Sequence, residues 1–297
     1  MLMWGVLPVA LKPLLEQLDA YTITWYRFLI SAAVLFAALA FRGSLPQLGA
    51  LSRGGWVLLA IAVVGLSINY AGYIVGLDLS TPANAQVLIQ LAPILLALGG
   101  LAIFHERFTR LQWGGFAILL TGLGLFFAGK FRALAQLAGS ADSAELSLYL
   151  KSVLALLIAA VTWAVYGLAQ KQLLRSFPSQ ALMLCIYAGC GICLTPLAQP
   201  MAALDLDALG WSLLVFCALN TVLGYGALAA SLQHLEASRI SALLALVPLA
   251  TFSSLWLASG LWPQSVAPEN IAAIALAGAL LVVCGSLVTA VGGENSS

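Results

Sequence analysis

Residues 163–171 read WAVYGLAQK and residues 4–12 read WGVLPVALK, so a tryptophan and a lysine recur at one spacing in two apolar stretches far apart in the chain. Three further pairs recur in the same order, Tyr70 with Tyr225, Pro93 with Pro248, and Gly115 of GFAILLTG with Gly278 of GALLVVCG. The order of these matches predicts that the second half of the chain repeats the first.

The composition is that of a membrane protein. Of the 297 residues, 62% are hydrophobic and 8% are charged, against roughly 45–50% and about 25% in soluble domains. A soluble fold of this composition would expose apolar patches larger than monomers tolerate, so the lipid bilayer must cover most of the surface. The net charge of +1 gives no reason to propose a nucleic-acid partner.

A spanning helix needs about 20 largely apolar residues, and the chain offers ten such stretches. We expect helices near residues 1–14, 21–41, 54–77, 82–104, 110–129, 148–171, 179–199, 209–233, 238–259 and 269–291. Each half, residues 1–137 and residues 138–297, then holds five spans. Because five is odd, the halves must cross the bilayer in opposite senses, as in many secondary transporters. The sequence predicts an all-α polytopic membrane protein of ten transmembrane helices in two inverted five-helix repeats, together one membrane domain.

The positive charges predict the orientation. With a cytoplasmic N-terminus, the inner loops hold Arg42, Arg53, Arg107, Arg110, Lys171, Arg175 and Arg239, and the short outer loops hold only Lys12. Glu269 is among the acids that then face outward. The protein is expected in the inner membrane, with both termini in the cytoplasm. The first helix looks short by comparison with its repeat, and no cleavable signal peptide is expected, because no basic region precedes the first apolar run.

Cysteines and acids point away from catalysis and metal binding. All five cysteines lie in apolar runs, where a thiol behaves as a small hydrophobe, and neither histidine is near the pair Cys190 and Cys193 in sequence. No catalytic residue, metal site or cofactor is predicted. None of the eleven Asp and Glu residues lies in the middle of a span, which disfavours proton or sodium coupling through an intramembrane carboxylate. Movement down a gradient, or coupling by groups that the sequence does not identify, stays open.

Three motifs resemble the EamA-type branch of the drug/metabolite transporter superfamily. They are WGVLPVALK in the first helix, YRF at residues 26–28, and DLSTPANAQVLIQLAPILLALGGLAIFHERF leading to GGFAILLTGLG. The chain departs from the family pattern where Leu261 aligns with Glu106 of the first half. The resemblance implies ten helices, a central cavity lined mainly by helices 1, 3, 4, 6, 8 and 9, and movement of small organic metabolites, often export.

Polar and aromatic side chains inside the spans are the candidates for substrate binding. Gln86 and Gln90 share one helix face, and buried amides need hydrogen-bond partners, in a neighbouring helix or a wet cavity. The tyrosines could instead belong to the interfacial belt and the tryptophans to the core. The full set is Trp4, Pro8, Asn69, Tyr70, Tyr73, Gln86, Gln90, Trp163, Tyr166, Asn220 and Tyr225. The second repeat has Ser241 and Ala245 where the first has the two glutamines.

The remaining intramembrane features have structural explanations. Lys12 and Lys171 should reach toward opposite interfaces, with a gating or carboxylate-binding role as the alternative. Arg27 should pair with an acid or a backbone carbonyl more readily than with substrate. Gly72 and Gly76 form a G-x-x-x-G motif that should seat a neighbouring helix.

These observations favour a transporter, by export, of small amphipathic metabolites such as amino acids, working by alternating access. A membrane-embedded lipid-modifying enzyme and a non-transporting subunit of a membrane complex are the alternatives. The enzyme would need a cluster of acids, histidines or an activated nucleophile at one membrane face. Whether the chain forms a homodimer stays open.

Overall fold

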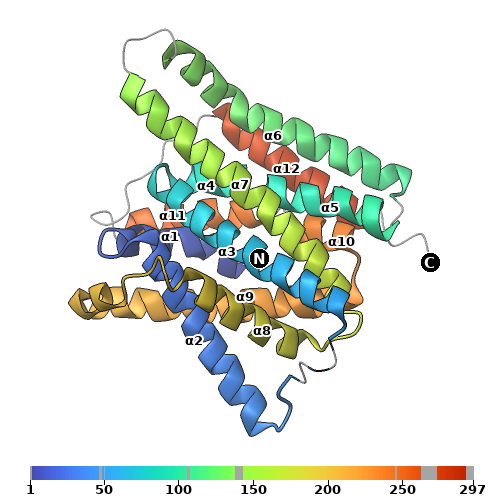
Figure 1. Cartoon of the computed structure of the whole chain (residues 1–297). Helices are drawn as coiled ribbons and strands as arrows, with labels where there is room; N and C mark the ends of the chain where they lie inside the picture. The colour runs from blue at the N-terminus through green and yellow to red at the C-terminus, as the bar shows by residue number, and fades with distance from the viewer. Residues whose placement is uncertain are drawn as a thin grey trace.

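The computed structural model describes residues 2–46, 49, 51–105, 108–137, 143–244, 246–261 and 273–291. The described residues form helices and no strand (Figure 1). The helices are α1 (Leu2–Leu15), α2 (Ala20–Phe41), α3 (Arg53–Asp78), α4 (Pro82–Leu88), α5 (Leu91–Phe104), α6 (Arg110–Leu137), α7 (Ser143–Leu173), α8 (Ser179–Leu194), η2 (Pro200–Asp205), α9 (Ala208–His234), α10 (Ala237–Leu244), α11 (Val247–Leu261) and α12 (Ala273–Val291). Four residues named above lie outside the described residues: Glu106, Arg107, Ala245 and Glu269.

Six described helical stretches are long and apolar enough to cross a membrane. They are Ala20–Phe41, Arg53–Asp78, Asn84–Phe104, Arg110–Ala128, Ser147–Leu173 and Ala208–His234. Three shorter apolar helices cover Leu2–Leu15, Ser179–Leu194 and Ala273–Thr289. The expected all-helical membrane architecture is confirmed at this level.

Two of the expected helices are interrupted. The stretch predicted as one helix over residues 82–104 is α4 followed by α5, and the stretch over residues 238–259 is α10 followed by α11. A proline lies shortly after each interruption, at Pro93 and at Pro248. Proline has no N–H for the carbonyl four residues earlier, and its ring crowds that carbonyl. The sequence did not reveal the interruptions, because each stretch is apolar throughout and hydrophobicity does not depend on the loss of one backbone hydrogen bond.

Small residues let α3 and α7 pack closely. A Cβ atom added to Gly72 would lie 3.0 Å from the carbonyl oxygen of Ala155, and one added to Gly76 would overlap Leu156. Asn69 lies on the same side of α3 and donates from Nδ2 to the carbonyl of Ala159 at 2.9 Å. The prediction that this G-x-x-x-G motif seats a neighbouring helix is confirmed.

Glycines also bring α6 and α12 into backbone contact, and the two helices run side by side in Figure 1. A Cβ atom on Gly122 would lie 2.6 Å from the carbonyl oxygen of Gly278 and 2.6 Å from the backbone nitrogen of Val282. Gly115 faces Gly285 in the same way, at a second contact along the same two helices. Close approach of this kind is how apolar helices gain van der Waals contact in lipid.

The two lysines of the repeated motif each bond a carbonyl at the C-terminus of a helix. Lys12 donates from Nζ to the carbonyl of Asp78, the last residue of α3, at 3.0 Å. Lys171 donates to the carbonyl of Leu235, which caps the C-terminus of α9, at 3.5 Å. A cation is favourable at a helix C-terminus, where backbone carbonyls lack partners.

The α6–α12 contact makes a stability prediction that has a control in the same helix. Gly122→Ala should destabilise the protein by roughly 1–3 kcal/mol, because the added methyl group meets backbone atoms that cannot move aside separately. Gly124→Ala should be neutral or slightly stabilising, since nothing lies within 4 Å of a Cβ at that position. The unfolding temperature of the detergent-purified variants measures both. Equal unfolding temperatures would mean that α6 and α12 are not packed through their glycines.

Candidate functional site

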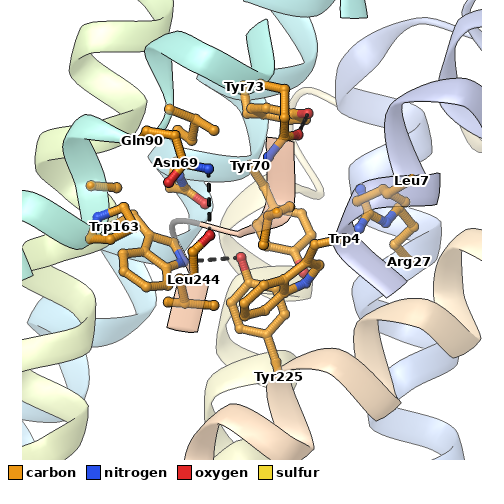
Figure 2. Close-up of a pocket in the computed structure, with 15 residues that line it drawn as sticks. Trp4, Leu7, Arg27, Asn69, Tyr70, Tyr73, Gln90, Trp163, Tyr225 and Leu244 are labelled. Carbon is orange, nitrogen blue, oxygen red and sulfur yellow. Dashed lines mark hydrogen bonds between the residues drawn. The ribbon is translucent and has the colours of Figure 1, made fainter. Parts of the chain in front are cut away.

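A cavity lies where the two interrupted helices meet the rest of the protein (Figure 2). Its empty volume is about 640 Å³, part of which is open to the outside. The lining residues are Trp4, Leu7, Arg27, Asn69, Tyr70, Tyr73, Gln86, Ile89, Gln90, Ala92, Pro93, Trp163, Tyr225, Leu244 and Val247. They come from α1, α2, α3, α4, α5, α7, α9, α10 and α11 and from the break between α4 and α5.

The interrupted helices are joined across the cavity by one hydrogen bond. Gln90 lies in the break between α4 and α5 and donates from Nε2 to the carbonyl of Leu244, the last residue of α10, at 3.5 Å (Figure 2). That carbonyl is four residues before Pro248, so it is the one that the proline leaves without its usual helical donor. In the first half, the carbonyl of Ile89 is freed by Pro93 and instead accepts from the nitrogen of Ala92 at 2.9 Å.

Four aromatic side chains form one wall. The rings of Trp4 and Tyr225 have centroids 5.0 Å apart, and those of Tyr70 and Tyr225 are 5.4 Å apart. Trp163 meets Trp4 edge to face at 6.4 Å and donates from Nε1 to the Tyr225 hydroxyl at 3.3 Å (Figure 2). Edge-to-face and tilted pairs suit the ring quadrupoles, so this wall is held together without filling the cavity.

The repeated motif therefore has a structural consequence. Trp4 and Trp163 occupy matching places in the two copies, and both reach the same cavity from α1 and α7. On another part of the lining, the Tyr73 hydroxyl donates to Oε1 of Gln86 at 3.2 Å. Asn69 lines the cavity while its amide nitrogen bonds α7.

Arg27 was not expected at the cavity. Its side chain is only 1% exposed, and its guanidinium carbon lies 4.6 Å from the centre of the Tyr70 ring. Its Nε donates to Oγ1 of Thr221 on α9 at 3.1 Å. No carboxylate among the described residues pairs with it. The expected acid or backbone carbonyl is therefore not found among the described residues, and the Thr221 hydroxyl takes its place. The signal that could have found Arg27 is its position inside a span, where a charge marks a pathway by default.

Three of the eleven candidates do not line the cavity. Pro8 is buried in α1. Tyr166 is fully buried, with its hydroxyl toward the sulfur of Met183 at 3.8 Å. Asn220 donates from Nδ2 to the carbonyl of Met3 and so ties α9 to the start of α1. Their positions inside apolar spans made these residues candidates, but position in a span could not tell a cavity from a neighbouring helix.

Two polar atoms at the cavity lack a protein partner. Oε1 of Gln90 and Nε1 of Trp4 are buried and make no hydrogen bond to described residues. Buried polar atoms without partners are costly, and ordered water or a ligand usually satisfies them. The arrangement can hold a solute with an apolar body against the aromatic wall and polar groups at a few fixed points. Among the described residues, no group of three or more His, Cys, Asp or Glu could hold a metal ion.

Comparison with known proteins gives a consistent picture. The EamA-like transporter family matches residues 1–128 and residues 150–291. An uncharacterized transporter of Haemophilus influenzae is 37% identical over 289 residues, covering 97% of this chain and 91% of the relative. The uncharacterized inner membrane transporter YhbE of Escherichia coli K12 is 35% identical over 290 residues, covering 97% of this chain and 88% of the relative.

A solved crystal structure shares the fold. It superposes with a TM-score of 0.68 at 21% sequence identity and covers 98% of this chain and 93% of its own. Counted as predicted spans, the first, third, fourth, sixth, eighth and ninth correspond to α1, α3, α4 with α5, α7, α9, and α10 with α11. All of these line the cavity, as the resemblance implied, and α2 contributes in addition through Arg27.

Proposed function

We propose, from the premise that this chain belongs to the EamA-like transporter family, that it carries small amphipathic metabolites such as amino acids across the inner membrane. Export is the proposed direction. The observation that carries the proposal is the cavity between the two interrupted helices, whose lining is aromatic and amide with one buried cation. Transporter sites typically lie at such interruptions, where irregular backbone is tolerated because it lines a cavity.

The proposed architecture is ten spans in two inverted five-helix units, residues 1–137 and residues 138–297. The helix contacts support it, because they occur in corresponding pairs. α3 packs on α7 as α9 packs on α1, and α5 packs on α7 as α11 packs on α1. α6 with α12 and α2 with α8 each pair an element with its own counterpart. The lysine bonds to Asp78 and Leu235 correspond in the same way.

The proposed mechanism is alternating access between these units. Each unit contributes one interrupted helix, and the two meet at the hydrogen bond between Gln90 and Leu244. A helix interrupted at a proline can change its angle there with little loss of backbone hydrogen bonding. Rocking of one unit against the other would then open the cavity to either side of the membrane in turn.

A membrane-embedded enzyme and a non-transporting subunit are less well supported. The family and the relatives of both bacterial species carry the name of transporters. The chemically informative side chains at the cavity are aromatic rings, amides and one arginine, a set suited to holding a solute. We therefore rank transport first.

Flux should depend on the aromatic wall. Trp163→Ala should lower the efficiency of uptake into proteoliposomes about tenfold, the effect of losing about 1.4 kcal/mol of binding free energy. The measurement uses a panel of radiolabelled amino acids and related metabolites, because the cargo is unidentified. Gln90→Leu should lower flux as well, since it removes the donor to the Leu244 carbonyl.

The matched control is Trp256→Ala in α11. This tryptophan is 79% exposed, on a surface that the proposed fold turns toward lipid, so its loss should change flux by no more than about twofold. Unchanged flux in both Trp163→Ala and Gln90→Leu would remove the cavity from the transport pathway.

The threading of the chain makes a separate prediction. Single cysteines at Arg53 and Arg175, in a background without native cysteines, should react with an impermeant maleimide only in inverted vesicles, because both positions are proposed to be cytoplasmic. A cysteine at Asp205, between α8 and α9, should react in intact cells. Labelling of Arg53→Cys and Arg175→Cys from opposite sides would contradict the inverted repeat.

A further inference from the structure

The charge of Arg27 is not balanced by any described residue at the cavity. Arginine stays protonated in proteins, so burial cannot neutralise it as it would a lysine. Arg27 as a residue is 1% exposed, and its guanidinium is the one charged group in the described lining of the cavity. An unpaired charge inside a protein is strongly unfavourable, and one inside a membrane protein marks a substrate or ion pathway by default.

The protein contacts of Arg27 leave much of its binding capacity free. Nε donates to Thr221 at 3.1 Å, and the guanidinium lies over the Tyr70 ring at 4.6 Å. Neither terminal nitrogen has a hydrogen-bond partner among the described residues. A guanidinium presents five donors in a planar fork, which matches the two oxygens of a carboxylate.

A buried amide oxygen independently indicates a ligand in the cavity. Oε1 of Gln90 belongs to a side chain that is 3% exposed, and it lines the cavity without a partner among the described residues. The Tyr70 hydroxyl interacts with the hydroxyl groups of Thr221 and Tyr225, and its ring is the one that Arg27 covers. Arg27 and Gln90 lie on opposite sides of the cavity, with Tyr70 between them (Figure 2).

We infer that the cargo carries a single carboxylate bound by the fork of Arg27, with an apolar or aromatic body against the wall of Trp4, Trp163 and Tyr225. This inference rests on the transport function proposed above. One positive charge balances one carboxylate, whereas a phosphate monoester would bring a second negative charge with no described cation to meet it. A hydrogen-bond donor at the end of the cargo remote from the carboxylate has Oε1 of Gln90 as its acceptor.

The test compares ligands that differ only at the carboxylate. The binding of 3-phenylpropionate and of 3-phenylpropionamide to the detergent-purified protein is measured by tryptophan fluorescence and by the shift in unfolding temperature. Hexanoate and hexanamide form a second pair without the ring, and phenyl phosphate tests the dianion. In the wild type, each carboxylate should bind at least about tenfold more tightly than its amide, and phenyl phosphate should bind more weakly than 3-phenylpropionate.

Variants separate the charge from a structural role. Arg27→Gln should reduce the preference for carboxylate over amide to within about twofold. Arg27→Lys should restore part of the preference, because it keeps the charge without the fork. Thr221→Val, which removes the partner of Nε and keeps the charge, should retain the preference. The matched control is Arg53→Gln, an exposed arginine at the start of α3, which should bind like the wild type.

The outcomes distinguish this inference from the transport function. Equal binding of carboxylate and amide by the wild type would overturn the inference, as would loss of the preference in Thr221→Val to the same extent as in Arg27→Gln. Tighter binding of phenyl phosphate would overturn the assignment to a carboxylate. Absence of binding by every probe would overturn the inference if metabolite flux is still observed in proteoliposomes, and would count against transport itself if flux is absent too.

Discussion

Pro93 and Pro248 each remove a backbone N–H from the middle of an apolar helix, where lipid cannot supply a substitute partner. The carbonyls of Ile89 and Leu244 must then be satisfied by the protein itself. Ile89 accepts from the nearby nitrogen of Ala92, and Leu244 accepts from the amide of Gln90 in the other half of the chain. The two interruptions are consequently held against each other, and the space beside them is the cavity.

The surrounding helices keep this space open because they pack tightly elsewhere. Glycines bring α6 to α12 and α3 to α7 at backbone distance, so the helices have firm contacts outside the cavity. The aromatic rings of Trp4, Trp163 and Tyr225 contact one another. Arg27 is then buried at a point where its charge faces hydroxyls, an aromatic ring and empty volume. A cavity with these properties is suited to an amphipathic solute that carries one negative group.

The sequence predicted the membrane architecture because composition and apolar run length follow directly from the bilayer as solvent. The glycine-mediated contact of α3 with α7 was also predictable, since the spacing of Gly72 and Gly76 places both on one face. Eight of the eleven candidate residues line the cavity because polar and aromatic side chains inside a span must face protein or water.

The other features of the site depend on tertiary contacts that the sequence pattern does not contain. Asn220 and Tyr166 lie inside the protein, but their polar groups bond to other helices: Asn220 donates to the carbonyl of Met3, and the Tyr166 hydroxyl donates to the sulfur of Met183. Arg27 was expected to pair with an acid or a backbone carbonyl, whereas the fold turns it toward Thr221 on α9 and the cavity. The interruptions at Ile89–Gln90 and after Leu244 were hidden by uniformly apolar sequence on both sides.

The central claim is that this cavity is wet and reaches both faces of the membrane in turn. Its most direct test is the reactivity of a single cysteine at Gln86, in a background without native cysteines, toward an impermeant thiol reagent applied separately to right-side-out and inverted vesicles. Thr251→Cys, at a fully buried position outside the lining, is the control that should stay unlabelled. The cysteine at position 86 should be labelled from both sides. Labelling from neither side, or from one side alone under all conditions, would contradict alternating access through this cavity.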